Sequence, residues 1–167
     1  MSISRRSLLL GGTALAAIGA LYWPRQANSL RAAEGNFEFQ LTDEEWQARL
    51  SPAAYKVLRH EDTEYPGTSP LLNEHRAGIF ACAGCELPLF DAATKYDSGT
   101  GWPSFYQPLE NAVGESTDNL LGYARTEVHC RRCGGHLGHV FNDGPEPTGL
   151  RYCMNGVALS FIPASGA

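Results

Sequence analysis

Four of the five cysteines form two Cys-x-x-Cys pairs, a spacing typical of metal sites. The pairs are Cys82 with Cys85 and Cys130 with Cys133. Together they supply the four thiolates that bind a tetrahedral zinc ion, and a site with four protein ligands leaves no open position for catalysis. We therefore predict one structural zinc ion. The 44 residues between the pairs exceed the usual zinc-ribbon spacing and indicate a β insertion between two hairpins.

Other uses of these cysteines compete with zinc. Two disulfides would suit an exported protein, and a Cys-x-x-Cys pair can be a redox motif. A mixed ligand set of Cys130, Cys133, His136 and His139 is a further alternative, but it would leave Cys82 and Cys85 without a role. The paired spacing favours zinc bound by the four cysteines.

Cys153 stands apart from both pairs and is a candidate nucleophile. A leftover cysteine is either a buried, inert residue or a reactive one. Arg151 lies two residues earlier, on the same face if this segment is a strand. A nearby cation lowers the pKa of a thiol and increases the fraction of nucleophilic thiolate. Asn155 lies on that face too and offers amide donors.

The elements around these residues are mainly short strands. A capping box of Thr42 and Glu45 predicts a first short helix, with Trp46 and Leu50 on one face. Ser51-Pro52 predicts the start of a second. Eighteen Gly and ten Pro indicate many turns after that. Apolar segments predict strands of a small antiparallel β domain at 78–81, 87–90, 120–128, 137–141 and 157–162, with Pro88 placing 87–90 at an edge or in a turn.

The first 29 residues differ from the rest of the chain. They contain Arg5 and Arg6 followed by an apolar stretch, 8–20, which predicts a secretory signal of the twin-arginine type. Cleavage at Ala27-Asn28-Ser29 and retention as an uncleaved membrane anchor are both compatible with this sequence. We expect export to the bacterial periplasm, a linker over 30–40 and a single domain over 41–163. The net charge of −5, with no basic run after the N-terminus, argues against a nucleic-acid partner.

Four ordered blocks of sequence resemble the type B peptide-methionine (R)-S-oxide reductases. The blocks are CAGCELPLF (82–90), KYDSGTGWPSF (95–105), HLGHVFNDGP (136–145) and PTGLRYCMN (147–155). The resemblance extends from about residue 41 to residue 162. It implies a fold of two antiparallel sheets, a structural zinc ion held by four cysteines, and reduction of the R epimer of methionine sulfoxide, free or in proteins.

The resemblance also implies a role for each residue of the site. Cys153 would attack the sulfoxide sulfur and become a sulfenic acid. His139 would be the main acid or proton relay, with His136 as its partner. Asn155 would complete the catalytic group, and the substrate would contact Trp102, Phe141 and Arg151. In a regular strand His136 and His139 face opposite sides, so a bulge at Gly138 is needed to bring both to one pocket.

One position departs from many members of that family. Where they carry a second, resolving cysteine, this chain has Thr100. With the other four cysteines on zinc, no thiol remains to form an internal disulfide with Cys153. We therefore expect a one-cysteine cycle in which an external thiol, small or on a thioredoxin-like protein, reduces the sulfenic acid.

Two rival functions remain from sequence. A non-catalytic zinc-ribbon-like binding module would explain the cysteine pairs but leaves Cys153, the two histidines and the leader without a role. A zinc hydrolase needs an open metal position, which four cysteine ligands close.

Overall fold

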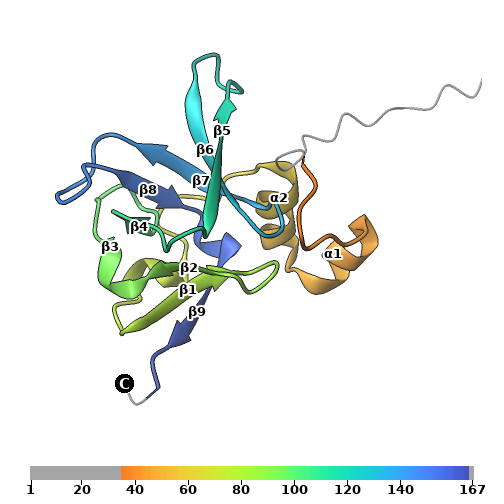
Figure 1. Cartoon of the computed structure of the whole chain (residues 1–167), viewed down its shortest axis with the longest axis horizontal. Coiled ribbons are helices and arrows are strands. Elements are labelled where there is room, and N and C mark those ends of the chain that lie inside the picture. The colour runs from red at the N-terminus through yellow and green to blue at the C-terminus, as the bar shows by residue number, and fades with distance from the viewer. Residues whose placement is uncertain (1–34, 166–167) are drawn as a thin grey trace, which may run out of the picture.

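The computed structural model describes residues 35–165, which form two antiparallel sheets and two short α-helices (Figure 1). This confirms the predicted mainly β fold. The leader predicted for residues 1–29 lies outside the described residues. Within the described part of the chain, no helix is long and apolar enough to span a membrane.

The smaller sheet has the strand order β2-β1-β9. Its strands are β1 (Gly78–Cys82), β2 (Pro88–Asp91) and β9 (Leu159–Pro163). β2 lies at an edge, as expected of a strand that contains proline, because proline cannot donate a hydrogen bond to a neighbour.

The larger sheet has the order β3-β4-β8-β7-β6-β5. Its strands are β3 (Lys95–Tyr96), β4 (Ser104–Phe105), β5 (Val113–Asp118), β6 (Arg125–Cys130), β7 (His136–Phe141) and β8 (Arg151–Met154). Short 3₁₀ turns, Pro70–Asn73, Ala92–Thr94 and Gly156–Ala158, join several of the elements. β8, which carries Cys153, therefore lies inside the sheet between β4 and β7.

The two helices are α1 (Asp43–Arg49) and α2 (Pro52–His60), and both begin as the sequence predicts. Thr42 and Glu45 form the capping box of α1. Ser51 caps α2, and Pro52 occupies its first turn. Trp46 and Leu50 are buried in the core.

The hydrophobic core lies between the two sheets. Phe80 of β1 and Phe105 of β4 have ring centroids 5.0 Å apart, and Phe90 of β2 stacks on Phe105 at 4.3 Å. All three side chains are fully buried. This aromatic layer holds the smaller sheet against the strands that flank Cys153.

The strand expected over 120–128 forms only in its second half. The chain turns at residues 119–124, and β6 begins only at Arg125. Gly122 adopts a φ of +80°, and the N–H of Leu120 donates to the Asp118 carboxylate, so both residues belong to the turn. The apolar residues Leu120, Leu121 and Tyr123 gave this turn the composition of a strand.

Candidate active site and metal centre

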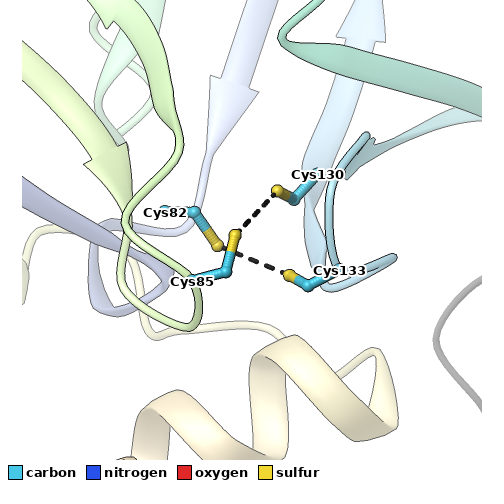
Figure 2. A group of neighbouring side chains, drawn as sticks. All are labelled: Cys82, Cys85, Cys130 and Cys133. Carbon is cyan, nitrogen blue, oxygen red and sulfur yellow. Dashed lines mark hydrogen bonds between the residues drawn. The ribbon is translucent and has the colours of Figure 1, made fainter. Parts of the chain in front are cut away.

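The four paired cysteines converge at one point, as Figure 2 shows. All four sulfur atoms lie within 4.8 Å of one another, and all four residues are buried. Cys82 Sγ lies 3.7 Å from Cys133 Sγ, and Cys85 Sγ lies 3.5 Å from Cys130 Sγ. A tetrahedron with Zn–S bonds of about 2.3 Å has edges of about 3.8 Å, so the thiolates fit zinc. They are too far apart for disulfides, which need about 2.05 Å.

Each cysteine pair lies in the same kind of turn. The N–H of Glu86 donates to Cys82 O, and the N–H of Gly134 donates to Cys130 O, both at 2.8 Å. Glu86 and Gly134 both adopt a left-handed conformation, with φ of 65° and 68°. This turn brings the second cysteine of each pair back beside the first. The two turns follow β1 and β6, so zinc bound there would join the two sheets.

The mixed cysteine–histidine ligand set does not form. His136 and His139 each hold a carboxylate instead of approaching Cys130 and Cys133. Among the described residues, only the four-cysteine group is arranged to hold a metal ion.

Cys153 lies at the centre of β8, opposite Ser104 on one neighbour and His139 on the other. Its side chain is partly exposed, unlike those of the other cysteines. Thr100 Oγ1 is 3.9 Å from Cys153 Sγ. Thr100, where a resolving cysteine was expected in many family members, thus contacts the Cys153 sulfur but carries a hydroxyl.

The environment of Cys153 corrects one expectation from sequence. Burial raises the pKa of the Cys153 thiol above its ordinary value, and the opposing effects of Thr100, Arg151 and Ser104 do not cancel it. Arg151 is already paired with the Asp143 carboxylate through Nε and Nη2, at 2.8 and 2.9 Å. A cation with its own carboxylate partner does less for a nearby thiolate than a free one, so the resting sulfur is a thiol.

A bulge in β7 brings the two histidines to the same side of the strand. His136 pairs with His129 of β6, whereas Gly138 pairs with Val128, so two steps along β7 match one step along β6. The rings of His136 and His139 consequently lie 5.4 Å apart. A Cβ at Gly138 would lie 2.1 Å from Cys153 O, so only glycine allows this close approach of β7 and β8.

His136 lies behind the site rather than at its surface. It is 2% exposed, and its Nδ1 is 2.8 Å from Glu127 Oε1. Burial acts to raise the pKa of Glu127, but hydrogen bonds from His136 and Ser116 outweigh it, so that this pKa is lowered. Ionised Glu127 accepts the Nδ1–H proton of His136, which fixes the orientation of the ring.

His139 lies beside Cys153 and is held by a carboxylate from the neighbouring hairpin. Its Nε2 is 2.7 Å from Asp118 Oδ2, and Arg125 forms an ion pair with the same oxygen. Burial lowers the pKa of His139 below its ordinary value, although the hydrogen bond to Asp118 opposes this. The imidazole is therefore neutral at pH 7 and can accept a proton.

A cavity of about 130 Å³ has Cys153 among its lining residues. It is much smaller than the roughly 300 Å³ or more of a typical small-molecule pocket, so it suits a single side chain. Its lining residues come from the 61–68 loop, the 99–103 loop, strands β6 to β8 and the residue directly after β8. They are Thr63, Trp102, Arg125, Gly138, His139, Phe141, Cys153 and Asn155.

Trp102 and Asn155 line the cavity, and both are fixed by Glu64. Trp102 Nε1 donates to Glu64 O at 2.9 Å, and Asn155 Oδ1 accepts from Glu64 N at 2.8 Å. Asn155 Nδ2 also donates to Leu137 O. The Asn155 amide therefore joins the loop to the β7 bulge.

Phe141 lines the cavity, whereas Arg151 supports it from behind. The Arg151 guanidinium lies 4.3 Å from the centroid of the Phe141 ring. Neither Arg151 nor His136 is among the cavity-lining residues. Arg151 instead contacts Phe141, and His136 lies beside His139; Phe141 and His139 both line the cavity.

Four residues of the site were not predicted from the sequence: Thr63 and Arg125 in the cavity, and Asp118 and Glu127 behind the histidines. The two acids lie in or beside a segment whose strand boundaries were wrong. A signal did exist for Glu127, because a buried acid near a histidine is a frequent partner of that histidine. Thr63 lies in an irregular loop, where no pattern indicates contact with Cys153.

A model of the SelR domain family matches residues 50–163. A peptide methionine sulfoxide reductase MsrB of Pseudomonas putida strain W619 is 56% identical over 127 residues, which cover 75% of this chain and 96% of the relative. Its counterpart in Leptospira interrogans is 50% identical over 127 residues, which cover 75% of this chain and 97% of the relative. The MsrB of Leifsonia xyli is 52% identical over 134 residues, which cover 79% of this chain and 96% of the relative.

The region matched by the family model, 50–163, includes both cysteine pairs, Cys153 and the other lining residues of the cavity. The chain therefore belongs to the SelR domain family, the family of the MsrB-type peptide methionine sulfoxide reductases.

Proposed function

We propose that this protein reduces the R epimer of methionine sulfoxide in proteins to methionine, with Cys153 as the nucleophile. The observation that carries the proposal is the pairing of Cys153 with His139 across β8 and β7, at a cavity the size of one side chain. The names of the relatives, which describe peptide methionine sulfoxide reductases, support it.

The chemistry balances between the substrate and this one thiol. The neutral imidazole of His139 takes the proton of the Cys153 thiol, and the thiolate attacks the electrophilic sulfur. This attack forms a sulfur–sulfur bond between Cys153 and the substrate. The oxygen then moves to the Cys153 sulfur: the new Cys153 sulfur–oxygen bond forms as the sulfur–oxygen bond of the substrate and the sulfur–sulfur bond break, which leaves methionine and the sulfenic acid of Cys153. The proton returned by His139 ends on the oxygen. The sulfur of Cys153 is oxidised as that of the substrate is reduced.

The two pKa shifts support this order of events. Burial raises the pKa of Cys153 and lowers that of His139, so the resting pair is a neutral thiol and a neutral imidazole. The thiol of Cys153 then carries the proton that the sulfoxide oxygen needs, and no proton has to come from solvent. A proton transferred within a pre-positioned pair costs less than one recruited from solvent.

The aromatic side chains suit the substrate's S-methyl group. Trp102 and Phe141 line the cavity, and sulfur–aromatic contacts are favourable. Their positions are held by Glu64 and Arg151, so the pocket is formed before the substrate arrives.

External thiols would restore the enzyme. Cys153 is the only cysteine of the described chain outside the metal cluster, and Thr100 replaces a resolving thiol. One external thiol would displace water from the sulfenic acid to give a mixed disulfide. A second would release Cys153 and leave as a disulfide with the first. The resident zinc would supply no catalytic chemistry and would hold the two sheets together.

Export by the twin-arginine route to the bacterial periplasm is part of the proposal. It rests on Arg5, Arg6 and the apolar stretch after them. Proteins that cross already folded could bind zinc in a reducing cytosol before they meet an oxidising compartment. Fractionation of cells that express the chain, with Arg5 and Arg6 both intact or both changed to Lys, tests this directly.

A non-catalytic zinc-binding module would not need a thiol at the base of a cavity. The test uses separately prepared R and S sulfoxides of a blocked methionine, with pre-reduced wild-type protein and Cys153→Ser. We expect about one equivalent of methionine from the R epimer alone and none in the variant. Folded, zinc-bound wild type that converts neither epimer would refute the proposal.

A further inference from the structure

The tip of the β5–β6 hairpin carries exposed apolar side chains beside the active site. Five large hydrophobic residues of the described chain are exposed, and three of them lie in this one turn. They are Leu120, Leu121 and Tyr123, at 52%, 60% and 60% exposure, called the apolar tip below. Figure 1 shows the hairpin extending away from the rest of the molecule.

The fold gives no reason for apolar residues there. Gly122 supplies the left-handed conformation of the turn, and the Asp118 carboxylate caps it through the N–H of Leu120. None of the three side chains packs against the hydrophobic core. Clustered exposed apolar side chains of this kind mark interaction surfaces.

The apolar tip is connected to the catalytic pair through one carboxylate. Asp118 accepts from Leu120 N at 2.8 Å and from His139 Nε2 at 2.7 Å. Arg125, at the other end of the turn, pairs with Asp118 in register and lines the cavity. Because Leu120 is two residues from Asp118, the tip begins directly beyond the Asp118–Arg125 pair, of which Arg125 lines the cavity.

We propose that the apolar tip binds the apolar polypeptide segment that flanks an oxidised methionine in a partly unfolded protein. Methionine is mostly a core residue, so its neighbours in sequence are often apolar and become exposed when oxidation loosens the core. The tip would contact residues that lie a few positions from the sulfoxide in the extended substrate chain. This inference rests on the proposed function.

Continuity with the cavity favours a polypeptide over other occupants. Arg125, at the base of the tip, is one of the residues that line the cavity, so a chain whose sulfoxide enters the cavity can continue along the hairpin. A membrane surface is a poorer partner, because the protein carries a net charge of −5 and bacterial lipids include anionic ones.

The test compares two peptides with a central methionine-R-sulfoxide, one flanked by Leu and Val and the other by Ser and Thr. A blocked methionine-R-sulfoxide, too short to reach the tip, is the reference substrate. The proteins are the full-length chain, the triple variant Leu120→Ser, Leu121→Ser, Tyr123→Ser, and the control Ile162→Ser. Ile162 is also exposed, at 49%, but lies on β9 of the other sheet.

We expect kcat/KM of the wild type to favour the apolar peptide by about tenfold, mainly through KM. The triple variant should lose this preference and retain the rate with the reference substrate, and Ile162→Ser should behave as wild type. A wild type inactive on the reference substrate would refute the proposed function itself.

A wild type that reduces the reference substrate without preference between the peptides would overturn the inference alone. So would a triple variant that retains the preference. If the triple variant instead loses self-association in size-exclusion chromatography, or binding to anionic lipid vesicles, while the peptide preference persists, the tip serves another partner and the inference is wrong.

Discussion

Thr100 and Cys153 illustrate how one side chain sets the reaction cycle. Thr100 Oγ1 lies 3.9 Å from Cys153 Sγ, close enough that a sulfur at this position would need only a small movement to bond. The hydroxyl can stabilise the thiolate by a hydrogen bond but cannot reduce a sulfenic acid. In the proposed one-cysteine cycle, the lack of a thiol at this residue is the reason that the sulfenic acid needs an external reductant.

The variant Thr100→Cys should convert the enzyme to an internal-disulfide cycle. After one equivalent of R sulfoxide and no reductant, we expect a cross-link between the introduced thiol and Cys153 to account for about one disulfide per chain by peptide mapping. Thr100→Ser, the matched control, should form none. A reacted Thr100→Cys protein without this cross-link would contradict the placement of Thr100.

His139 should govern the acid limb of the pH profile. Below its pKa the imidazole is protonated and cannot accept the Cys153 proton, so the single-turnover rate falls. Burial lowers this pKa, Arg125 and His136 lower it further, and Asp118 raises it. Removing the Asp118 charge should therefore move the acid limb to lower pH.

The variant Asp118→Asn, measured by stopped-flow single turnover, tests this direction. Asp143→Asn is the control, because Asp143 holds Arg151 rather than His139 and should leave the acid limb in place. A limb that shifts to higher pH in Asp118→Asn would contradict the assignment of His139 as the proton acceptor.

The β7 bulge is the element that assembles the site. It places His136 behind His139 and brings Gly138 against Cys153 O of β8. The sequence indicated the need for a bulge, because two histidines three residues apart cannot share a face of a regular strand. It could not indicate that only His139 would reach the cavity, since this depends on how β6 and β7 pair.

Gly138→Ala should disrupt this element. The added Cβ would lie 2.1 Å from Cys153 O, and the backbone must shift to relieve it, at a cost of about 2 kcal/mol in the free energy of unfolding. Gly149→Ala, where no atom lies within 4 Å, should cost only about 1 kcal/mol for its left-handed φ.

Urea unfolding with excess zinc measures both variants. If Gly138→Ala is no less stable than Gly149→Ala and keeps the wild-type single-turnover rate, the close approach of β7 to β8 is not what positions Cys153.

At the same scale, the β5–β6 hairpin shows where sequence patterns fail. β5 has the sequence VGESTD, which lacks the apolar alternation of a half-buried strand, while the turn after it is rich in leucine. The apolar residues therefore led to a strand being predicted in the turn, whereas the real strand β5 was not predicted. Asp118, the partner of His139, was missed for this reason, whereas helix starts and cysteine pairs depend on local chemistry and were predicted correctly.

For the whole molecule, the group of four cysteines brings together residues from the two sheets. Cys82 ends β1 of the smaller sheet, and Cys130 ends β6 of the larger one. Binding of structural zinc by four thiolates contributes on the order of 10 kcal/mol, comparable to the stability of a whole domain.

The purified protein should therefore contain about one zinc per chain, and a strong chelator should abolish cooperative thermal unfolding near the native melting temperature. Cys133→Ser should lose zinc and fold poorly, whereas Cys153→Ser should keep both zinc and the native melting temperature. Metal analysis and calorimetry check these outcomes. Loss of zinc from Cys153→Ser would show that Cys153 is a ligand.

The most direct test of the account is mass spectrometry of the wild-type chain after one equivalent of methionine-R-sulfoxide, without reductant and with a sulfenic acid trap. We predict that Cys153 alone carries the trap, in an amount equal to the methionine formed, with Cys82, Cys85, Cys130 and Cys133 unmodified. Methionine formed while Cys153 stays unmodified, or a disulfide between Cys153 and any of those four, would contradict it.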